Sequence, residues 1–286
     1  MAFELASPLC FLLLLLLLPF FTTAQTDQTK NISLGSTLTA LHNKSFWASP
    51  SGDFAFSFRE IGKHGFLLAI WFNKIPERTI VWSANGDNLV SKGSAVELTA
   101  DGRFMLNDVA TGKQISVADF VGTGVSYAAM LDTGNFILAN RNSTILWQSF
   151  DQPTDTILPL QILNQKGIII ARYTPTNYSK GRFRFALQSN GQLLLYTTHF
   201  PLDSANTTIY WSTDTKDSCF QVIYNMSGSI YLTARNRSIL HMISSNTVSF
   251  QDFYQRATVD YDGVLRHYVY PKSTGTSAAG GNHGLD

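Results

Sequence analysis

The chain has 286 residues and a formal net charge of +1, with 14% charged and 13% aromatic residues. This length accommodates two domains of about 120 residues each, and the aromatic content favours a packed β-rich protein over a disordered or coiled-coil one. The near-zero charge argues against nucleic acid or an anionic membrane surface as the main partner.

The N-terminus has the features of a targeting signal. An apolar stretch runs from Leu9 to Phe21, and the small residues 22–24 follow it. We expect residues 1–24 to be a signal peptide, which predicts a secreted or extracellular protein. An uncleaved anchor is the alternative, because Glu4 is present and Lys or Arg is missing before the stretch, but about 13 apolar residues are short for a span. The rest of the sequence predicts no membrane span in the mature chain.

A nine-residue pattern occurs six times along the chain. The copies are residues 49–57, 99–107, 131–139, 188–196, 225–233 and 260–268. The fourth position is always glycine, the sixth is always apolar, and the eighth is apolar except at His267. Glycine there fits a tight turn with positive φ, followed by a strand. Because strand side chains alternate, positions 4, 6 and 8 predict a buried face and the odd positions an outer face that could hold a ligand.

The spacing of the copies divides the chain in two. The longest gap between successive repeat glycines separates Gly134 from Gly191. Two sets of three copies, each with its own core, suit this break better than one evenly spaced propeller or solenoid. We therefore place a domain boundary between Trp147 and Pro159.

The sequence also indicates passage through the secretory pathway. Seven Asn-x-Ser/Thr sequons predict glycosylation at Asn31, Asn43, Asn142, Asn177, Asn206, Asn225 and Asn236. Cys10 lies in the signal peptide, so Cys219 is a single cysteine in the mature chain. It could be a buried inert thiol, form an intermolecular bridge, or pair with a cysteine outside this chain, and we favour the last of these.

Two stretches carry a family resemblance. Residues 79–90 read TIVWSANGDNLV and residues 145–159 read ILWQSFDQPTDTILP, with LDTGNFIL at 131–138. Together they resemble plant bulb-type (G-type) mannose-lectin domains, as in the ectodomains of S-domain lectin receptor-like serine/threonine kinases. The resemblance implies an all-β fold of two tandem β-prism units, each with three four-stranded sheets and pseudo-threefold symmetry. We assign 25–150 to a bulb-type lectin domain, 151–272 to a second, degenerate one, and 273–286 to a flexible tail.

The same resemblance implies where sugar would bind. The family motif Q-x-D-x-N-x-V-x-Y places its polar side chains at positions 1, 3, 5 and 9 around one mannose, with valine as an apolar floor. The fourth copy is the nearest match and supplies the candidates Gln188, Asn190, Gln192, Leu194 and Tyr196, of which only Gln188 and Tyr196 keep the family residue. The third copy keeps Asn135, the second keeps Asp101, and the sixth keeps Asp262 and Tyr268 around a disruptive Arg266.

These features predict a carbohydrate-binding, mannose-type lectin-like ectodomain or secreted lectin, which the resemblance places in cell-surface recognition and plant defence. The alternative is a non-sugar protein-interaction module: a truncated receptor, a decoy or a dimerising ectodomain. The sequence contains none of the kinase motifs, and its histidines and cysteines lack metal-ligand spacing, so we expect no catalysis, metal or cofactor. Asp151 and Asp155 could suggest a glycosidase, but Pro153 favours a turn in which aspartate caps backbone groups.

Overall fold

The computed structural model describes residues 31–41, 45–118, 124–199, 207–272 and 283–284. Within these ranges the chain forms 24 strands and one 3-10 helix, η1 (Ser149–Asp151), with no α-helix. Among these described residues, no helix is long and apolar enough to cross a membrane. The strands build six four-stranded antiparallel sheets, which confirms the all-β prediction.

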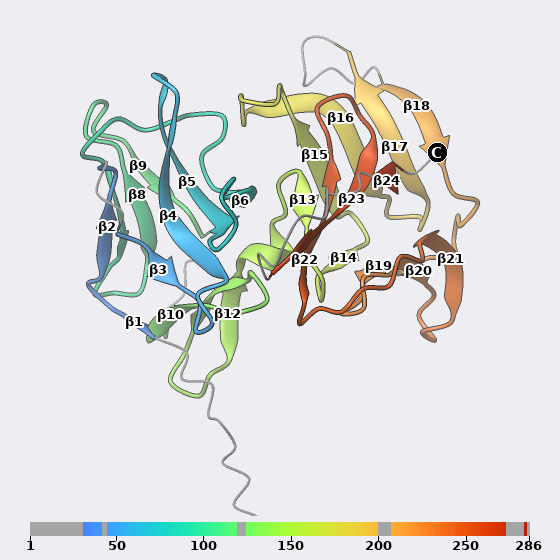
Figure 1. Cartoon of the computed structure of the whole chain (residues 1–286), viewed down its shortest axis with the longest axis horizontal. Helices are drawn as coiled ribbons and strands as arrows, with labels where there is room; N and C mark the ends of the chain where they lie inside the picture. The colour runs from blue at the N-terminus through green and yellow to red at the C-terminus, as the bar shows by residue number, and fades with distance from the viewer. Residues whose placement is uncertain (1–30, 42–44, 119–123, 200–206, 273–282, 285–286) are drawn as a thin grey trace, which may run out of the picture.

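The sheets form two sets of three with one shared topology (Figure 1). The first unit pairs β1 (Ile32–Ser33) with β10 (Tyr127–Met130), β11 (Phe136–Ala139) and β12 (Ile145–Gln148); β2 (Thr37–Thr39) with β7 (Ala95–Leu98), β8 (Phe104–Asn107) and β9 (Gln114–Ser116); and β3 (Trp47–Ala48) with β4 (Phe54–Ile61), β5 (Gly65–Phe72) and β6 (Ile80–Ser83). In Figure 1 this unit runs from blue to green.

The second unit repeats the arrangement in the part of Figure 1 that runs from yellow-green to red. It pairs β13 (Thr156–Ile157) with β22 (Phe253–Val259), β23 (Leu265–Pro271) and β24 (His283–Gly284); β14 (Ile162–Asn164) with β19 (Gln221–Tyr224), β20 (Ile230–Thr233) and β21 (Ile239–Ser244); and β15 (Ile168–Arg172) with β16 (Lys180–Leu187), β17 (Leu193–Thr198) and β18 (Thr207–Ser212). In both units, three opening strands are joined by later strands in reverse order.

The assigned domain limits remain predictions. The sheets change from the first unit to the second between Gln148 and Thr156, whereas the proposed limit lies between residues 150 and 151. The predicted signal peptide 1–24 lies outside the described residues. So does the predicted tail 273–286, apart from β24, whose two residues pair with β23.

Each copy of the repeat forms a turn followed by a strand. The strands β4, β8, β11, β17, β20 and β23 all begin at the sixth, apolar position of their copy. In every copy the glycine amide donates to the carbonyl of the first position, at 2.8–3.2 Å. The six glycines have φ between 75° and 100°, a region that a side chain would strain, so the sequence prediction of a positive-φ turn is confirmed.

The even positions of the copies fill two separate cores. Phe54, Phe104 and Phe136 lie in the core of the first unit, where the Phe56 and Phe136 rings stack at 4.3 Å. Leu193, Ile230 and Leu265 occupy the matching places in the second unit. Threefold repetition of the same apolar position therefore brings three sheets to one centre, because each sheet must bury its inner face.

His267 is the one polar residue at positions 6 and 8 of the copies, and it is also buried. Its Nε2 lies 2.8 Å from the hydroxyl of Tyr224 and its Nδ1 lies 3.4 Å from the hydroxyl of Ser244. These partners satisfy the ring nitrogens without solvent, which is the usual condition for a buried imidazole. The exception in the repeat is thus a hydrogen-bonded core residue.

The outer faces of the first and third copies are buried as well. Ala55 of the first copy belongs to a second apolar cluster with Trp71 on β5. The strand β5 is buried on both faces, as its uninterrupted apolar sequence predicts. Ile137 and Ala139 of the third copy form a further cluster with Ala129. These two copies therefore have little free outer surface for a ligand.

The segment between the units is packed into both of them. Residues 155–159 are buried. Ile157 lies in the core of the second unit and the next residue, Leu158, lies in the core of the first, as alternation along an extended chain requires. From the second unit, Tyr254 also enters the first core. The two units therefore share buried surface.

Candidate functional site

The fourth copy presents its odd positions on the outer face of β17. The amide of Gln188 donates to the carbonyl of Gln192 at 2.9 Å, which closes the turn before the strand. Gln188, Gln192 and Tyr196 are half-buried, Asn190 is exposed and Leu194 is buried. Because the positions are two residues apart, the structure brings all five candidates from this copy along one face of one strand and its turn.

Three polar groups on this face are available to a ligand. Among the described residues, the side chains of Gln188 and Gln192 and the hydroxyl of Tyr196 form no hydrogen bond with the protein. Asn190 differs, because its Oδ1 accepts from the amide of Gln192 at 3.1 Å and so belongs to the turn. Amides and a phenol offer both donors and acceptors, which is what adjacent sugar hydroxyls require.

Residues of the neighbouring strands β16 and β18 lie beside Leu194 and Tyr196 on this face. Leu194 is opposite the buried Ala186 of β16, which makes an apolar floor. The pairing with β18 shifts by one residue next to Tyr196, which then lies between Arg184 on one side and Ile209 on the other. A bulge of this kind re-aims a side chain, and here it sets the direction of the terminal tyrosine.

Asn135 lies apart from the fourth copy and bonds within the protein. It is buried, its Nδ2 donates to Gln148 Oε1 at 2.8 Å, and its Oδ1 accepts from the Ser149 hydroxyl and the Phe150 amide, both at 3.2 Å. Its side chain thereby joins the start of β11 to η1. A carbohydrate contact from Asn135 remains a prediction.

Asp101 is separate from both of these places. It is exposed, and it accepts hydrogen bonds from the Thr99 hydroxyl at 2.5 Å and from Arg103 Nε at 2.8 Å. The hydrogen bond from Thr99 lowers the pKa of Asp101. Desolvation acts in the opposite direction, and the bond from Arg103 lowers the pKa further. The carboxylate stabilises its own turn, and its predicted role with sugar remains a prediction.

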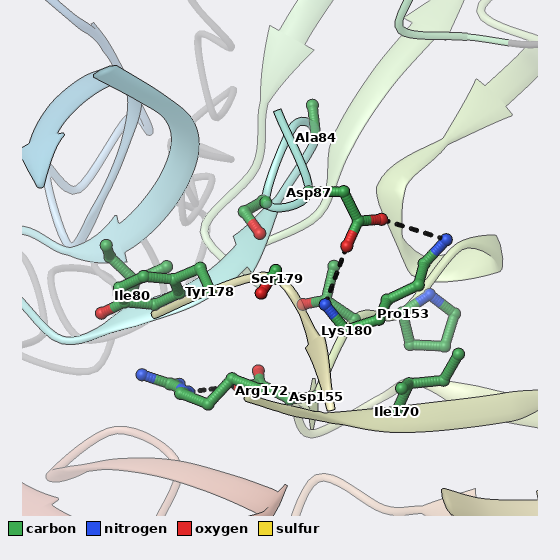
Figure 2. Close-up of a pocket in the computed structure, with 13 residues that line it drawn as sticks. Ile80, Ala84, Asp87, Pro153, Asp155, Ile170, Arg172, Tyr178, Ser179 and Lys180 are labelled. Atoms are coloured by element: carbon green, nitrogen blue, oxygen red, sulfur yellow. Dashed lines mark hydrogen bonds and ion pairs between the residues drawn. The ribbon is translucent and has the colours of Figure 1, made fainter. Parts of the chain in front are cut away.

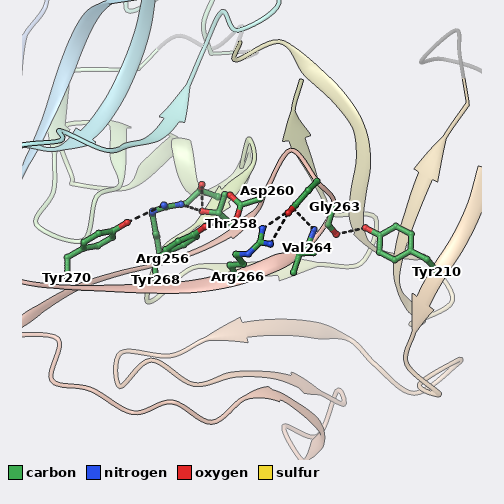
Figure 3. Close-up of polar contacts among 11 residues, drawn as sticks. Tyr210, Arg256, Thr258, Asp260, Gly263, Val264, Arg266, Tyr268 and Tyr270 are labelled. Carbon is green, nitrogen blue, oxygen red and sulfur yellow. Dashed lines mark hydrogen bonds and ion pairs between the residues drawn. The ribbon is translucent and has the colours of Figure 1, made fainter. Parts of the chain in front are cut away.

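The sixth copy carries a closed polar network instead of an open face (Figure 3). Arg266 binds Asp260 and Asp262, each at 2.8 Å, and the Tyr268 hydroxyl donates to Asp260 at 2.6 Å. The hydrogen bond from Arg266 lowers the pKa of Asp262, and burial raises the pKa of Tyr268 to about 12. Arg266 therefore disrupts the motif by occupying both carboxylates.

A hollow of ≈ 140 Å³ lies between the units (Figure 2). Lys180 reaches Asp87 from across it, with its amide 2.8 Å and its Nζ 3.4 Å from the carboxylate. Below them Arg172 Nε lies 2.6 Å from Asp155. Gly86 is required at the rim, because a Cβ there would lie 2.2 Å from the carbonyl oxygen of Tyr178.

Sequence reasoning did not identify this hollow, although a signal was present. Its lining takes residues from both stretches that carry the family resemblance, 79–90 and 145–159. The interpretation of Asp155 as a backbone cap is wrong, because its carboxylate binds the guanidinium of Arg172. Burial lowers the pKa of Arg172, but the charge of Asp155 outweighs it and the pKa is raised.

Cys219 is buried and free. Its Sγ lies 3.5 Å from the carbonyl oxygen of Gln221, and burial raises the pKa of the thiol. A buried, protonated thiol is unreactive and cannot be reached by another chain without local unfolding. The structure therefore favours the inert thiol among the three alternatives for Cys219.

Comparison with known proteins gives a family match and long relatives. The family model for D-mannose binding lectin matches residues 79–169. The chain is 41% identical over 276 residues to the G-type lectin S-receptor-like serine/threonine-protein kinase LECRK3 of Oryza sativa subsp. indica, covering 93% of this chain and 33% of that protein. It is 39% identical over 243 residues to the G-type lectin S-receptor-like serine/threonine-protein kinase RLK1 of Arabidopsis thaliana, covering 79% of this chain and 29% of that protein. The chain thus spans about a third of these curated relatives.

Solved lectin structures also resemble part of the chain. The Japanese Marasmius oreades lectin has 18% identity and a TM-score of 0.33, covering 47% of this chain and 89% of that one. The mannose-specific agglutinin from snowdrop (Galanthus nivalis) bulbs, complexed with methyl-α-D-mannoside, has 16% identity and a TM-score of 0.32, covering 44% and 99%.

Proposed function

We propose, from the premise that this chain carries a bulb-type lectin domain and is related over most of its length to G-type lectin S-receptor-like kinases, that it binds carbohydrate of the mannose type. It acts as the recognition part of a cell-surface receptor or as a secreted lectin. The chain itself catalyses nothing in this proposal, since it spans only about a third of the kinases it matches and carries no kinase motif.

One observation supports the fourth copy as the binding face. Gln188, Gln192 and Tyr196 lie on one outer face, and their side-chain polar groups have no protein partner among the described residues. The outer faces of the first and third copies are buried, and that of the sixth is closed by Arg266. The fourth copy combines a residual family motif with polar groups that a sugar could use.

Alanine variants on β17 test the proposal. A glycan array on the mature chain, followed by titration with the best oligomannoside, should show binding that Gln188→Ala and Tyr196→Ala each weaken by about tenfold. This estimate corresponds to one or two lost hydrogen bonds and one lost aromatic contact. Tyr231→Ala is the matched control, because Tyr231 is also a half-buried tyrosine of the second unit but lies on β20, in a different sheet.

Two results would count against the assignment. If no glycan binds at high micromolar concentration, the chain is not a lectin in solution. If mannosides bind the variants and the wild-type chain equally, the sugar site is elsewhere, and Asp101 and Asn135 are the next residues to substitute.

We also propose that the chain is an extracellular glycoprotein acting in recognition or plant defence. Four sequon asparagines, Asn31, Asn142, Asn177 and Asn236, are exposed, and Asn225 is half-buried. Asn43 and Asn206 lie outside the described residues. Exposed turn positions are where glycans attach without disturbing a core, so this pattern supports export through the secretory pathway. Mass spectrometry of the chain expressed in plant cells would identify the occupied sites.

A protein-interaction module is the second candidate. The outward strands β18 and β21 carry exposed apolar side chains, among them Ile209, which is 54% exposed, and Ile239, which is 57% exposed. Each strand is at the edge of its sheet, and exposed apolar side chains there favour contact with another protein, such as a second copy of the chain. Light scattering of the wild-type chain and of Ile209→Ser together with Ile239→Ser would reveal a homodimer that depends on these strands.

A further inference from the structure

A larger hollow of ≈ 350 Å³ lies beside the one in Figure 2 and shares Arg172 and Tyr178 with it. It is lined from the first unit by Arg59 and Arg78 and from the second unit by Arg256. Its volume is within the usual range for small-ligand sites. Three arginines from two units thus converge on one surface depression.

None of these three arginines forms an ion pair with a carboxylate in the part of the chain that the structure describes. Arg59 lies over the ring of Trp71, with its Cζ 5.4 Å from the ring centroid. Arg256 is 8% exposed, lies over the ring of Tyr268 at 3.8 Å and donates to the hydroxyls of Thr258 and Tyr270, while its Nε has no hydrogen-bond partner. Guanidinium groups that are buried or half-buried normally pair with an anion, so the lack of an anionic partner for these three calls for a ligand.

Most of the acidic side chains around the hollow do not offset these charges. Asp260 is bound to Arg266, and Asp155 is bound to Arg172, so neither is available to the three arginines. Glu60 and Glu77 also line the hollow, and both are exposed. Three arginines against these two glutamates leave an excess of positive charge at the hollow.

The first unit holds its two arginines together at a cost. Burial, and next the charge of Arg78, lower the pKa of Arg59. Arg78 itself has φ of 46°, a left-handed backbone conformation that strains any residue other than glycine. Strained residues next to like charges persist where a site requires them, and a bound anion would relieve the repulsion.

We propose that this hollow binds the anionic group of an acidic saccharide, with Arg59, Arg78 and Arg256 as ligands of a sugar carboxylate. A guanidinium matches a carboxylate with two parallel hydrogen bonds. Tyr261, which is 50% exposed, stands on the same lining and offers a ring face to the pyranose. The saccharide part of the proposal rests on the proposed lectin function, whereas the anion site rests on the arginines alone.

Calorimetric titration of the full chain with tri-galacturonate, at low and at physiological salt, tests the site. The acidic trimer should bind and the carboxyl-reduced trimer should not. Arg59→Gln with Arg78→Gln should weaken binding by about tenfold or more, in keeping with lost charge-assisted hydrogen bonds. Arg141→Gln, at an exposed arginine away from the hollow, is the matched control and should bind as the wild-type chain does.

A variant that is expected to bind the acidic trimer more tightly separates loss of the site from loss of the fold. Glu77→Gln removes a carboxylate from the rim and should strengthen binding of the acidic trimer, which a damaged fold would not do. Equal binding of both trimers, or no effect of the arginine substitutions, would overturn the proposal. Competition by inorganic sulfate without any binding of the acidic trimer would overturn its saccharide part. Loss of mannoside binding alone would leave this site standing, because β17 lies elsewhere.

Discussion

At the scale of single residues, the repeat glycine has two separable causes. Gly191 has φ of 79°, and a Cβ there would lie 2.6 Å from the carbonyl oxygen of Cys219. Gly35 has nearly the same φ, 82°, but open space around it. We expect Gly35→Ala to cost about 1–2 kcal/mol from the backbone conformation alone. Gly191→Ala should cost about 1–3 kcal/mol more from the clash, measured by urea denaturation. Equal losses would show that only the conformation requires glycine.

The contacts of Asp53 join the two units, and we expect them to weaken in acid. Its carboxylate lies 2.8 Å from Lys74 Nζ and 2.9 Å from Lys272 Nζ, and it accepts from the Tyr254 hydroxyl at 3.0 Å. Burial alone would raise the pKa of Asp53, but the bonds from Lys74 and then Lys272 lower it below the ordinary 3.8. A lowered pKa means stability that is present above the ordinary value and lost as the pH falls through the folded-state value.

Replacement of Asp53 should remove this pH dependence. We expect Asp53→Asn to lower the free energy of unfolding by about 1–3 kcal/mol at neutral pH, since two ammonium groups lose their acceptor. The difference from the wild-type chain should shrink below pH 3.8, as the wild-type carboxyl is protonated. Thermal unfolding across pH 2–7 measures it. Asp214→Asn, at an exposed aspartate, is the control, and the same loss there would refute a specific contact.

At the scale of elements, the repeat predicted the strands and their inner faces well. Six strands begin at the apolar sixth position because a positive-φ turn and alternating side chains are local properties. The outer faces could not be predicted in the same way. Ala55 is covered by Trp71, and Asn135 is held by Gln148, and both contacts join different strands. A pattern within one strand carries no information about which residue will cover it.

The larger hollow, which Arg59, Arg78 and Arg256 line, could not be predicted from a pattern within one strand either. Arg78 and Arg256 are 178 positions apart in the printed chain, so no spacing rule connects them. The pairing of Asp155 with Arg172 was likewise missed, because the flanking Pro153 indicated a turn and nothing nearby indicated an ion pair. Site residues brought together by tertiary packing require the structure, whereas the fourth-copy residues were accessible from one strand motif.

The segment joining the units should exchange its amide hydrogens slowly. The sequence predicted a domain boundary between Trp147 and Pro159, where an exposed linker is the usual arrangement. Residues 155–159 are instead buried, and the amide of Leu160 donates to the carbonyl of Tyr224 at 2.7 Å. We expect hydrogen exchange in a peptide covering 155–161 to be as slow as in β17, and much faster in the exposed turn at 109–113. Exchange of 155–161 at the rate of that turn would indicate a mobile linker.

At the scale of the whole molecule, the two units should unfold together although each has its own core. Tyr254 of the second unit is 2% exposed inside the first core, 4.8 Å from the ring of Phe72, and Leu158 enters the same core. The indole of Trp82 donates to the carbonyl of Gln152 at 2.8 Å, which ties the segment between the units to the first unit. Loss of either unit would expose these side chains, so calorimetry should show one transition.

Tyr254 is the residue on which this coupling most depends. Tyr254→Ala leaves a cavity in a core of the other unit and should cost about 3–5 kcal/mol, enough to separate the melting of the two units into two transitions. Tyr254→Phe keeps the ring and loses only the hydroxyl bond to Asp53, so it should cost about 1–3 kcal/mol and retain a single transition. Two transitions already in the wild-type chain, unchanged by Tyr254→Ala, would show that the units are stable independently and that the shared core contributes little to cooperativity.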